Sequence, residues 1–282
     1  MQDDIEIRTM SRAELEIAIG WAADEGWNPG LADGDCFHAS DPEGFLMAFK
    51  DGRPAASISV VAYGADYGFL GFYICNPAVR GQGLGYRLWQ AGLQRLDGRC
   101  VGLDGVVDQQ SNYRKEGFVL AHRNVRYGGT VACEAPEDPR LRPIAPGQIA
   151  AILAYDRPFF PGPREAFLKC WLRAGESRRG FVVIDEDGVA GYGVLRRCRE
   201  GYKIGPLFAE SPEDADLLFR ALAAGAGNTP IYLDPPEPNR EAISLAERYG
   251  LQPVFETARM YRGAAPALPL QQIFGITTFE LG

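Results

Sequence analysis

The sequence predicts an α/β (α+β) protein of two domains, each with a mixed central sheet flanked by helices. Three observations predict this class. Strand-like and helix-like apolar patterns alternate along the chain. Hydrophobic residues make up 46% of the 282 residues and charged residues 23%, a balance that gives a globular chain a large core. The order of elements in the first half returns in the second half, and the length suits two domains.

The first half begins with a predicted helix over residues 11–23, where apolar residues recur at helical spacing and Ser11 suits the N-cap. A turn at Asp51-Gly52 predicts a hairpin. The predicted strands are 45–49, 57–63, 67–75, 101–107 and 118–127, and the other predicted helices are 85–96 and 111–116, the last ending at Gly117.

Residues 128–146 are rich in glycine, proline and acidic residues, which is typical of a linker. We therefore predict one domain over 1–130, a linker over 131–142 and a second domain over 143–282. Matching stretches in the two halves are offset by roughly 130–136 residues, which indicates a duplicated domain. They pair 45–49 with 181–184, 69–75 with 202–208, Leu103-Asp104 with Leu233-Asp234, Gly117 with Gly250, and Arg126-Tyr127 with Arg259-Met260-Tyr261.

Charge and apolar patterning exclude several classes of protein. The net charge of −8 argues against general binding to nucleic acid, whose phosphates need a basic surface. Residues 1–8 are polar and acidic with no apolar signal core, and no run of 18 apolar residues could span a membrane. We therefore expect a cytoplasmic protein that binds neither nucleic acid nor a membrane.

The cysteines predict neither a metal site nor a disulfide framework. No pair has C-x-x-C spacing, and only His38 and His122 could add imidazole ligands, so no metal is expected. Free thiols are the expectation for Cys36, Cys75, Cys100, Cys133, Cys170 and Cys198.

The motif that carries chemistry is Arg80-Gly81-Gln82-Gly83-Leu84-Gly85, between a predicted strand and an amphipathic helix. Glycines let a backbone approach a ligand closely, and free N–H groups from Gln82 to Tyr86 at a helix start would bind a pyrophosphate. The sequence fits neither a Walker loop, which needs G-K-[ST], nor a dinucleotide fingerprint, which needs G-x-G-x-x-G. Its pattern is R-x-x-G-x-G instead.

Three motifs in order resemble the GNAT acetyltransferase family: 71–75, 80–85 and 112–118. Residues 25–30, 204–209 and 274–282 are similar to a two-domain bacterial GNAT subfamily with a degenerate second domain. The resemblance implies a tandem GNAT fold and acetyl-CoA as co-substrate. The residues it places at the coenzyme are Phe72, Tyr73, Ile74, Cys75, Arg80, Gly81, Gln82, Gly83, Leu84, Gly85, Tyr86 and Asn112.

The same resemblance implies transfer of acetyl from acetyl-CoA to a primary amine of a small molecule by direct attack. Tyr113 matches the tyrosine that donates a proton to the departing thiolate, a role that needs a protonated side chain at neutral pH. The base is open among Glu25, which we prefer, Asp104 or the nearby Asp108, and His122. Trp27, Asn28 and Asp104 are the predicted acceptor-binding residues. Cys75 is not expected to be a nucleophile, since no histidine neighbours it.

The second half lacks the glycines, and acids follow Phe208, so we expect no acetyl-CoA there; Ser211 suits an ordinary helix start. We expect this half to wall the acceptor cleft with Tyr155, Asp156, Arg157 and Phe159. The chain would be a monomer or homodimer. Two other functions stay open: a non-catalytic acyl-CoA or metabolite sensor, and acetylation of a protein lysine or N-terminus.

Overall fold

The computed structural model describes residues 4–282. Residues 1–3 lie outside the described residues, so the structure describes only part of the stretch 1–8, for which no signal sequence is expected. The first half contains β1 (Ile5–Thr9), α1 (Arg12–Asp24), α2 (Asp33–Ser40), β2 (Phe45–Lys50), β3 (Arg53–Tyr63), β4 (Tyr67–Cys75), η1 (Pro77–Val79), α3 (Leu84–Arg95), β5 (Cys100–Val106), η2 (Val107–Gln109), α4 (Gln110–Lys115) and β6 (Val119–Gly129).

The second half repeats this order. It contains β7 (Leu141–Pro143), η3 (Pro146–Gln148), α5 (Ile149–Asp156), η4 (Arg157–Phe159), α6 (Glu165–Trp171), β8 (Arg178–Asp185), β9 (Gly188–Arg197), β10 (Tyr202–Ala209), α7 (Pro212–Ala224), β11 (Ile231–Leu233), α8 (Arg240–Arg248), β12 (Gln252–Arg262), η5 (Leu270–Gln272) and β13 (Ile273–Gly275). The predicted duplication therefore extends to every helix and strand from β1 to β12.

Local chemistry explains the predicted helix starts. Ser11 accepts from the backbone N–H of Glu14, and the Glu14 side chain accepts from the backbone of Ser11, which closes a capping box on α1. The side chains of Ser211 and Asn239 cap α7 and α8 by accepting from the backbone N–H groups of Asp214 and Ala242. The strand β1 and the helix α2 were not predicted, because β1 is short and half-exposed and α2 has no side-chain cap.

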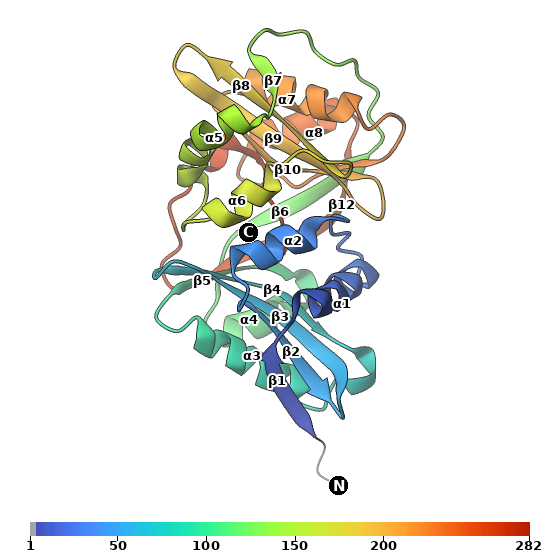
Figure 1. The fold of residues 1–282 in the computed structure, drawn as a ribbon, viewed down its shortest axis with the longest axis vertical. Coiled ribbons are helices and arrows are strands. Elements are labelled where there is room, and N and C mark those ends of the chain that lie inside the picture. Colours follow the sequence, from blue (N-terminus) through green and yellow to red (C-terminus); the bar gives the residue numbers. More distant parts are fainter. Residues whose placement is uncertain (1–3) are drawn as a thin grey trace.

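Residues 4–282 form one 13-stranded sheet rather than two separate ones, in the order β1-β2-β3-β4-β5-β12-β6-β11-β10-β9-β8-β7, with β13 beside β10. The mixed α/β class is confirmed, but the two predicted sheets are joined. The halves exchange their last strands: β12 pairs with β5, and β6 pairs with β11 (Figure 1). A strand from each half therefore lies inside the sheet of the other.

Two buried ion pairs hold the exchanged strands. Arg259 on β12 bonds both oxygens of Asp104 on β5 at 2.9 and 2.8 Å. Arg126 on β6 bonds both oxygens of Asp234, which directly follows β11, at 2.7 and 2.8 Å. Burial opposes the charged form of Asp234, but Arg126 outweighs it and holds the pKa of Asp234 below its ordinary value. The Asp and Arg positions that repeat in the sequence therefore pair between the halves.

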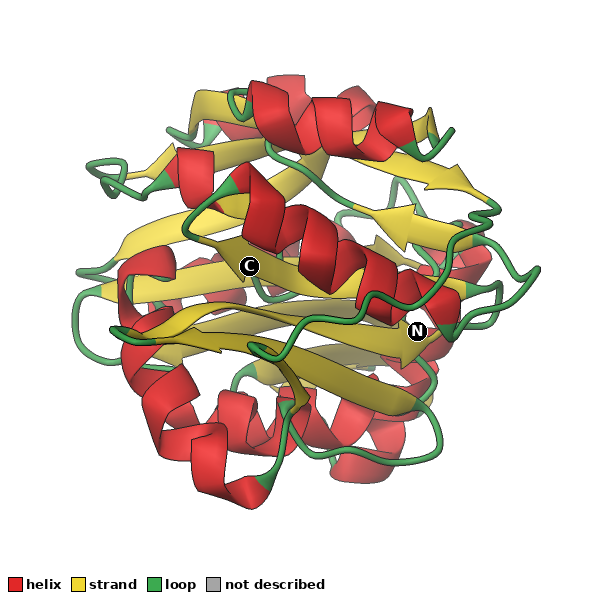
Figure 2. Ribbon diagram, turned by 90° about the horizontal axis from the view of Figure 1, so that it is seen from above, coloured by secondary structure: helices red, strands yellow, loops and turns green. Residues whose placement is uncertain are grey.

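Three apolar cores stabilise the sheet. One lies under α3 and another under α7 and α8, on the outer faces of the two halves. The largest lies between the halves and combines residues from Met10 to Leu281. Within it α2 packs against α6, and Figure 2 shows strands between outer layers of helices. The described residues contain no helix long and apolar enough to cross a membrane.

The expectation that all six cysteines are free thiols is wrong, because Cys36 on α2 and Cys170 on α6 form a disulfide. Their Cα atoms lie 5.3 Å apart, within the range that a disulfide requires. Their separation of 134 residues lies within the repeat offset, and α2 and α6 are equivalent helices, so the two cysteines hold equivalent positions of the two halves. The pseudo-twofold arrangement brings them together, which short-range spacing could not indicate.

Candidate active site

The strands β4 and β5 separate at the point where the sequence predicts the coenzyme strand. They pair in parallel from Tyr67 and Cys100 as far as Leu70 and Leu103. From Gly71 onward that edge of β4 has no strand partner in the described chain, while β5 continues along β12. The separation leaves backbone groups of β4 facing an opening in the sheet.

A bulge reshapes β4 at this opening. The pairing of β4 with β3 shifts register between Ser57 and Ser59, opposite residues 71–74. Phe72 has a φ of 46°, which is rare for a bulky residue and is tolerated only where the surroundings impose it. Its carbonyl accepts from the buried hydroxyl of Ser57 at 2.8 Å, which fixes the bulge.

The glycine-rich turn leaves the start of α3 open. Gly81 and Gly83 have φ values of 77° and 78°, and nothing lies within 4 Å of a Cβ built on either. Gly83 is the N-cap and provides no side-chain hydrogen bond, so the first N–H groups of α3 stay available. The equivalent helix α7 is closed by Ser211, whose hydroxyl accepts from the N–H of Asp214. Of these two equivalent helix starts, that of α3 therefore leaves its N–H groups free to bind an anion, whereas that of α7 is capped.

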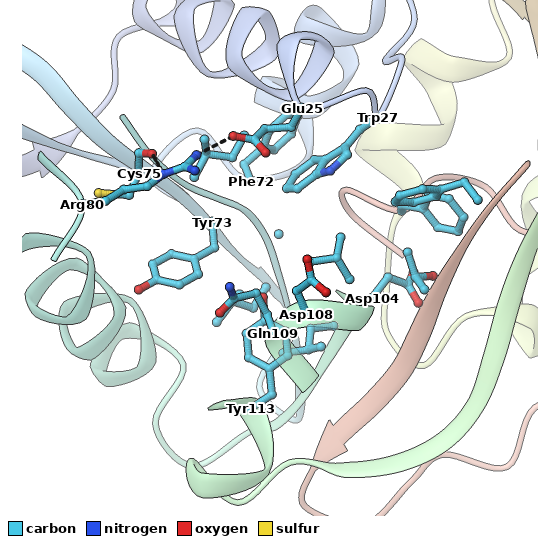
Figure 3. A pocket seen from close by; sticks show the side chains of 18 residues that line it. Glu25, Trp27, Phe72, Tyr73, Cys75, Arg80, Asp104, Asp108, Gln109 and Tyr113 are labelled. Carbon is cyan, nitrogen blue, oxygen red and sulfur yellow. Dashed lines mark hydrogen bonds and ion pairs between the residues drawn. The ribbon is translucent and has the colours of Figure 1, made fainter. Parts of the chain in front are cut away.

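A cavity of about 320 Å³ occupies the opening between β4 and β5 (Figure 3). Figure 3 shows Glu25 and Trp27 on one side and Asp108, Gln109 and Tyr113 opposite them. Residues of the first half that line it include Leu70, Gly71, Phe72, Tyr73, Ile74, Cys75, Arg80, Leu103, Asp104 and Val106. The second half contributes Phe255, Thr257 and Phe279. The cavity is therefore built by both halves of the chain.

The second half reaches this cavity through other residues than predicted. Asp156 is buried against Arg164 at 2.6 Å, and Phe159 stacks on Phe208 inside the core. Tyr155 and Arg157 also lie away from the cavity. The prediction that these four residues line it is wrong, because the exchanged strand β12 and the C-terminal segment occupy that side. The C-terminal residues 274–282 are similar to the two-domain subfamily, but nothing in the sequence indicates that this segment contributes to the cavity.

A second pocket of about 280 Å³ continues beside the turn. Tyr73, Gln109 and Tyr113 line both pockets. The other lining residues are Tyr86, Trp89, Asn112, Lys115 and Glu116. Tyr86 and Asn112 thus lie in a pocket that adjoins both the cavity and the start of α3.

Tyr113 lies between the two pockets. Its ring stacks on Trp89 at 5.4 Å, and Gly105 leaves space for it, since a Cβ there would lie 2.7 Å from the ring. Burial, with a smaller effect of Tyr73, raises the pKa of Tyr113 above its ordinary value. Burial raises the pKa of Tyr73 to about 12. Both phenols therefore carry their protons at neutral pH.

Three carboxylates line the cavity and differ in their partners. Glu25 is held by Arg80 at 2.6 Å, and Arg80 also donates to the Cys75 carbonyl. The Asp104 side chain has no solvent exposure, and Arg259 and Asn124 occupy both its oxygens. Among residues 4–282 no hydrogen bond or ion pair engages the side chain of Asp108, which is exposed at the cavity.

Trp27 and Asn28 follow α1 but face different surroundings. Trp27 lines the cavity, and its carbonyl accepts from Arg126 and from the buried Lys203. The side chain of Asn28 bonds both backbone groups of Glu200, and Asn28 does not line the cavity. The prediction that Asn28 contacts the acceptor therefore conflicts with its place, which is between the halves.

In the second half, the chain itself fills the equivalent of the opening. The strands β10 and β11 pair in parallel only from Tyr202 to Ile204, as β4 and β5 do before they separate. Beyond that point β13 pairs with Leu207 and Phe208 of β10. This edge is therefore occupied by backbone, which adds a second reason, besides the missing glycines, why no coenzyme is expected there.

His122, one of the candidate bases, does not line the cavity. It lies on β6 opposite Arg259 and beside Phe159 and Phe208 in a smaller pocket. Burial, and then the charge of Arg259, lowers the pKa of His122 to about 4. The fold keeps this imidazole neutral, which suits a structural role.

The lowered pKa of His122 predicts a loss of stability in acid. The unfolded chain takes up this proton near the ordinary pKa of 6.5, and the folded chain only near 4. The stabilisation is therefore complete above pH 6.5 and is lost as the pH falls through about 4, by at most about 3 kcal/mol. Urea unfolding between pH 7 and 4 should show a shallower decline for His122→Gln than for His38→Gln; equal slopes would contradict this.

Comparisons with known proteins agree with this architecture. A model of the acetyltransferase (GNAT) family matches residues 12–118, and a model of an acetyltransferase (GNAT) domain matches residues 152–275. Holothin acyltransferase of Pseudoalteromonas sp. strain SANK 73390 is 37% identical over 273 residues, which cover 96% of this chain and 92% of that relative. The chain belongs to the GNAT family, contains two GNAT domains and is an acyltransferase.

Solved structures share the fold over nearly the whole chain. A putative acetyltransferase from Pyrococcus horikoshii matches with a TM-score of 0.83 at 20% identity, and the match covers 99% of this chain and 96% of the Pyrococcus chain. A tandem GNAT protein from the clavulanic acid biosynthesis pathway matches with a TM-score of 0.62 at 12% identity, and the match covers 94% of this chain and 100% of that protein's chain. At these identities the likeness supports the tandem fold alone.

Proposed function

We propose that this enzyme transfers an acetyl group from acetyl-CoA to a primary amine of a small molecule by direct attack. One observation carries the proposal: the uncapped start of α3, with two open glycines, adjoins a cavity that reaches the free edge of β4. N–H groups at a helix start suit a pyrophosphate, and the free edge of β4 suits an extended acyl-carrying arm. Acetyl-CoA contains both.

The acceptor would enter from the side of Trp27, Phe255 and Phe279, whose rings favour a flat, apolar amine. The name of the 37%-identical relative, holothin acyltransferase, supports a small-molecule acceptor. The second half covers this side, which disfavours a wide peptide groove. The same relative favours an enzyme over a non-catalytic sensor.

We assign the proton transfers as follows. The amine nitrogen bonds to the thioester carbon, its proton moves to the carboxylate of Asp108, and the C–S bond breaks. Tyr113 then protonates the departing thiolate. Glu25, the base preferred from sequence, is less suited, since Arg80 engages its carboxylate. Burial raises the pKa of the Cys75 thiol, which disfavours a thiolate nucleophile and supports direct transfer.

The glycine cradle is tested by Gly83→Ala against Gly98→Ala. Gly98 has the same left-handed backbone, with a φ of 79°, and also has open space at its Cβ. Both variants should lose stability by about 1–2 kcal/mol. Only Gly83→Ala places a methyl group in the cradle, so it should weaken acetyl-CoA binding about 10-fold or more, or about 1.4 kcal/mol. Calorimetric titration measures this, and equal affinities of the two variants would contradict the cradle.

Catalysis is tested by the release of free thiol from acetyl-CoA with a panel of small primary amines. Thiol released in proportion to an N-acetylated amine supports the proposal. Tight binding of acetyl-CoA without turnover of any amine would favour the sensor instead.

A further inference from the structure

Thr257 carries an unused hydroxyl at the cavity. It lies on β12, its residue is 2% exposed, and it lines the cavity between β4 and β5. Its Oγ1 is buried and has no hydrogen-bond partner among the described residues. A buried hydroxyl without a partner costs about 1–3 kcal/mol, so its presence calls for an explanation.

The strand register directs Thr257 toward the acceptor side. Phe255, Thr257 and Arg259 alternate along β12 and share one face of the strand. Phe255 lines the cavity with Thr257, and Arg259 reaches Asp104, which lines it as well. Thr257 therefore belongs to the same wall as the aromatic ring of Phe255, which would cover the acceptor.

The polar side chains nearest to Thr257 make their hydrogen bonds to other groups. Asn124 lies opposite Thr257 in the β6–β12 pairing, but its Nδ2 donates to Asp104. The Oδ1 of Asn124 is likewise buried without a partner among residues 4–282. Both oxygens of Asp104 are already engaged by Arg259 and Asn124. The Oγ1 of Thr257 and the Oδ1 of Asn124 thus have no hydrogen-bond partner among the described residues beside the Asp104–Arg259 pair.

The repeat shows that the fold does not require threonine here. Asn124 is the equivalent of Thr257 in the first half, just as Arg126 is the equivalent of Arg259. Each of the two positions lies two residues before the arginine of a cross-half ion pair. Asparagine and threonine both fit that place, so the hydroxyl is available for a separate task.

We propose that Thr257 determines acceptor specificity by hydrogen bonding to a polar group of the acceptor other than its reacting amine. The inference rests on the proposed function, which places the acceptor in this cavity. The acceptor class is a small, flat, apolar primary amine that also carries a carbonyl or N–H group. The half without a coenzyme site thereby supplies recognition of the acceptor through its exchanged strand.

The test compares Thr257→Val with Tyr261→Phe in the full chain. Valine has nearly the shape of threonine, so Thr257→Val removes only the hydroxyl. Tyr261 also has a buried hydroxyl without a partner in the described part of the chain, and it does not line the cavity. The acceptor probes are benzylamine and its ring carboxamides, which differ only in a carbonyl and an N–H group.

Wild-type enzyme and Tyr261→Phe should prefer a carboxamide over benzylamine. Thr257→Val should raise the KM for that carboxamide about 10-fold, with acetyl-CoA affinity and the KM for benzylamine unchanged. An unchanged preference in Thr257→Val would overturn the inference, whether or not this variant gains stability as Tyr261→Phe does. Absence of turnover of any amine by the wild-type enzyme would instead refute the proposed function, so the two failures are distinguishable.

Discussion

Asp108→Asn is expected to lower kcat for amine acetylation about 100-fold or more, the usual contribution of a general base. Asparagine keeps the size of the side chain but cannot accept the amine proton. Asp108 is the carboxylate at the cavity that no cation engages among residues 4–282. It lies on η2, directly after β5, so it borders the opening where β4 and β5 separate. Steady-state thiol release measures the effect.

Glu25→Gln is the matched control for Asp108→Asn, because Glu25 lines the same cavity but is bound by Arg80. Its kcat should fall far less than that of Asp108→Asn. Both variants should bind acetyl-CoA as the wild type does, since neither residue belongs to the turn at Gly81 and Gly83. A larger loss in Glu25→Gln would return the role of base to Glu25, the residue preferred from sequence.

Arg259→Met is expected to lower the free energy of unfolding by about 3–5 kcal/mol, because it leaves a buried carboxylate without its cation. The side chain of Asp104 has no solvent exposure and that of Arg259 is 5% exposed. The pair joins β12 of one half to β5 of the other. Its loss should therefore weaken the joint between the halves, which chemical denaturation measures.

Arg199→Met is the matched control, because Arg199 pairs with Asp24 at the surface, where their side chains are 53% and 73% exposed. An exposed pair of this kind contributes only about 0–1 kcal/mol. The double variant Asp104→Asn with Arg259→Met should recover part of the loss, since no unpaired charge remains. Equal losses in Arg259→Met and Arg199→Met would show that the buried pair has no special weight.

Much of the fold could be predicted because its signals are local. Ser11 and Ser211 cap the helices that the apolar spacing indicates, and the Asp51-Gly52 turn joins β2 to β3. The glycines of the R-x-x-G-x-G motif indicate an anion site because glycine adopts a left-handed backbone conformation without strain and, having no side chain, lets a ligand approach the backbone closely. The recurrence of Asp104 as Asp234 and of Arg126 as Arg259 revealed the duplication.

The partners of these residues could not be predicted, since a repeat does not say whether equivalent segments stay in their own half. Arg126 and Arg259 each bind the aspartate of the other half. Cys36 and Cys170, far apart in sequence, are joined. For the same reason Phe255, Thr257 and Phe279 were missed as cavity residues, and Asn28 was assigned to the acceptor although it bonds Glu200.

The sequence by itself determined the elements, the duplication, the glycine turn and the acyltransferase family, because propensities, caps and backbone requirements act over a few neighbouring residues. Only the tertiary structure decided that the last strands are exchanged, that β13 fills the second opening, and that residues of both halves line the cavity between β4 and β5. Those outcomes depend on which buried surfaces and charges meet, and that is set by packing between residues distant in the chain.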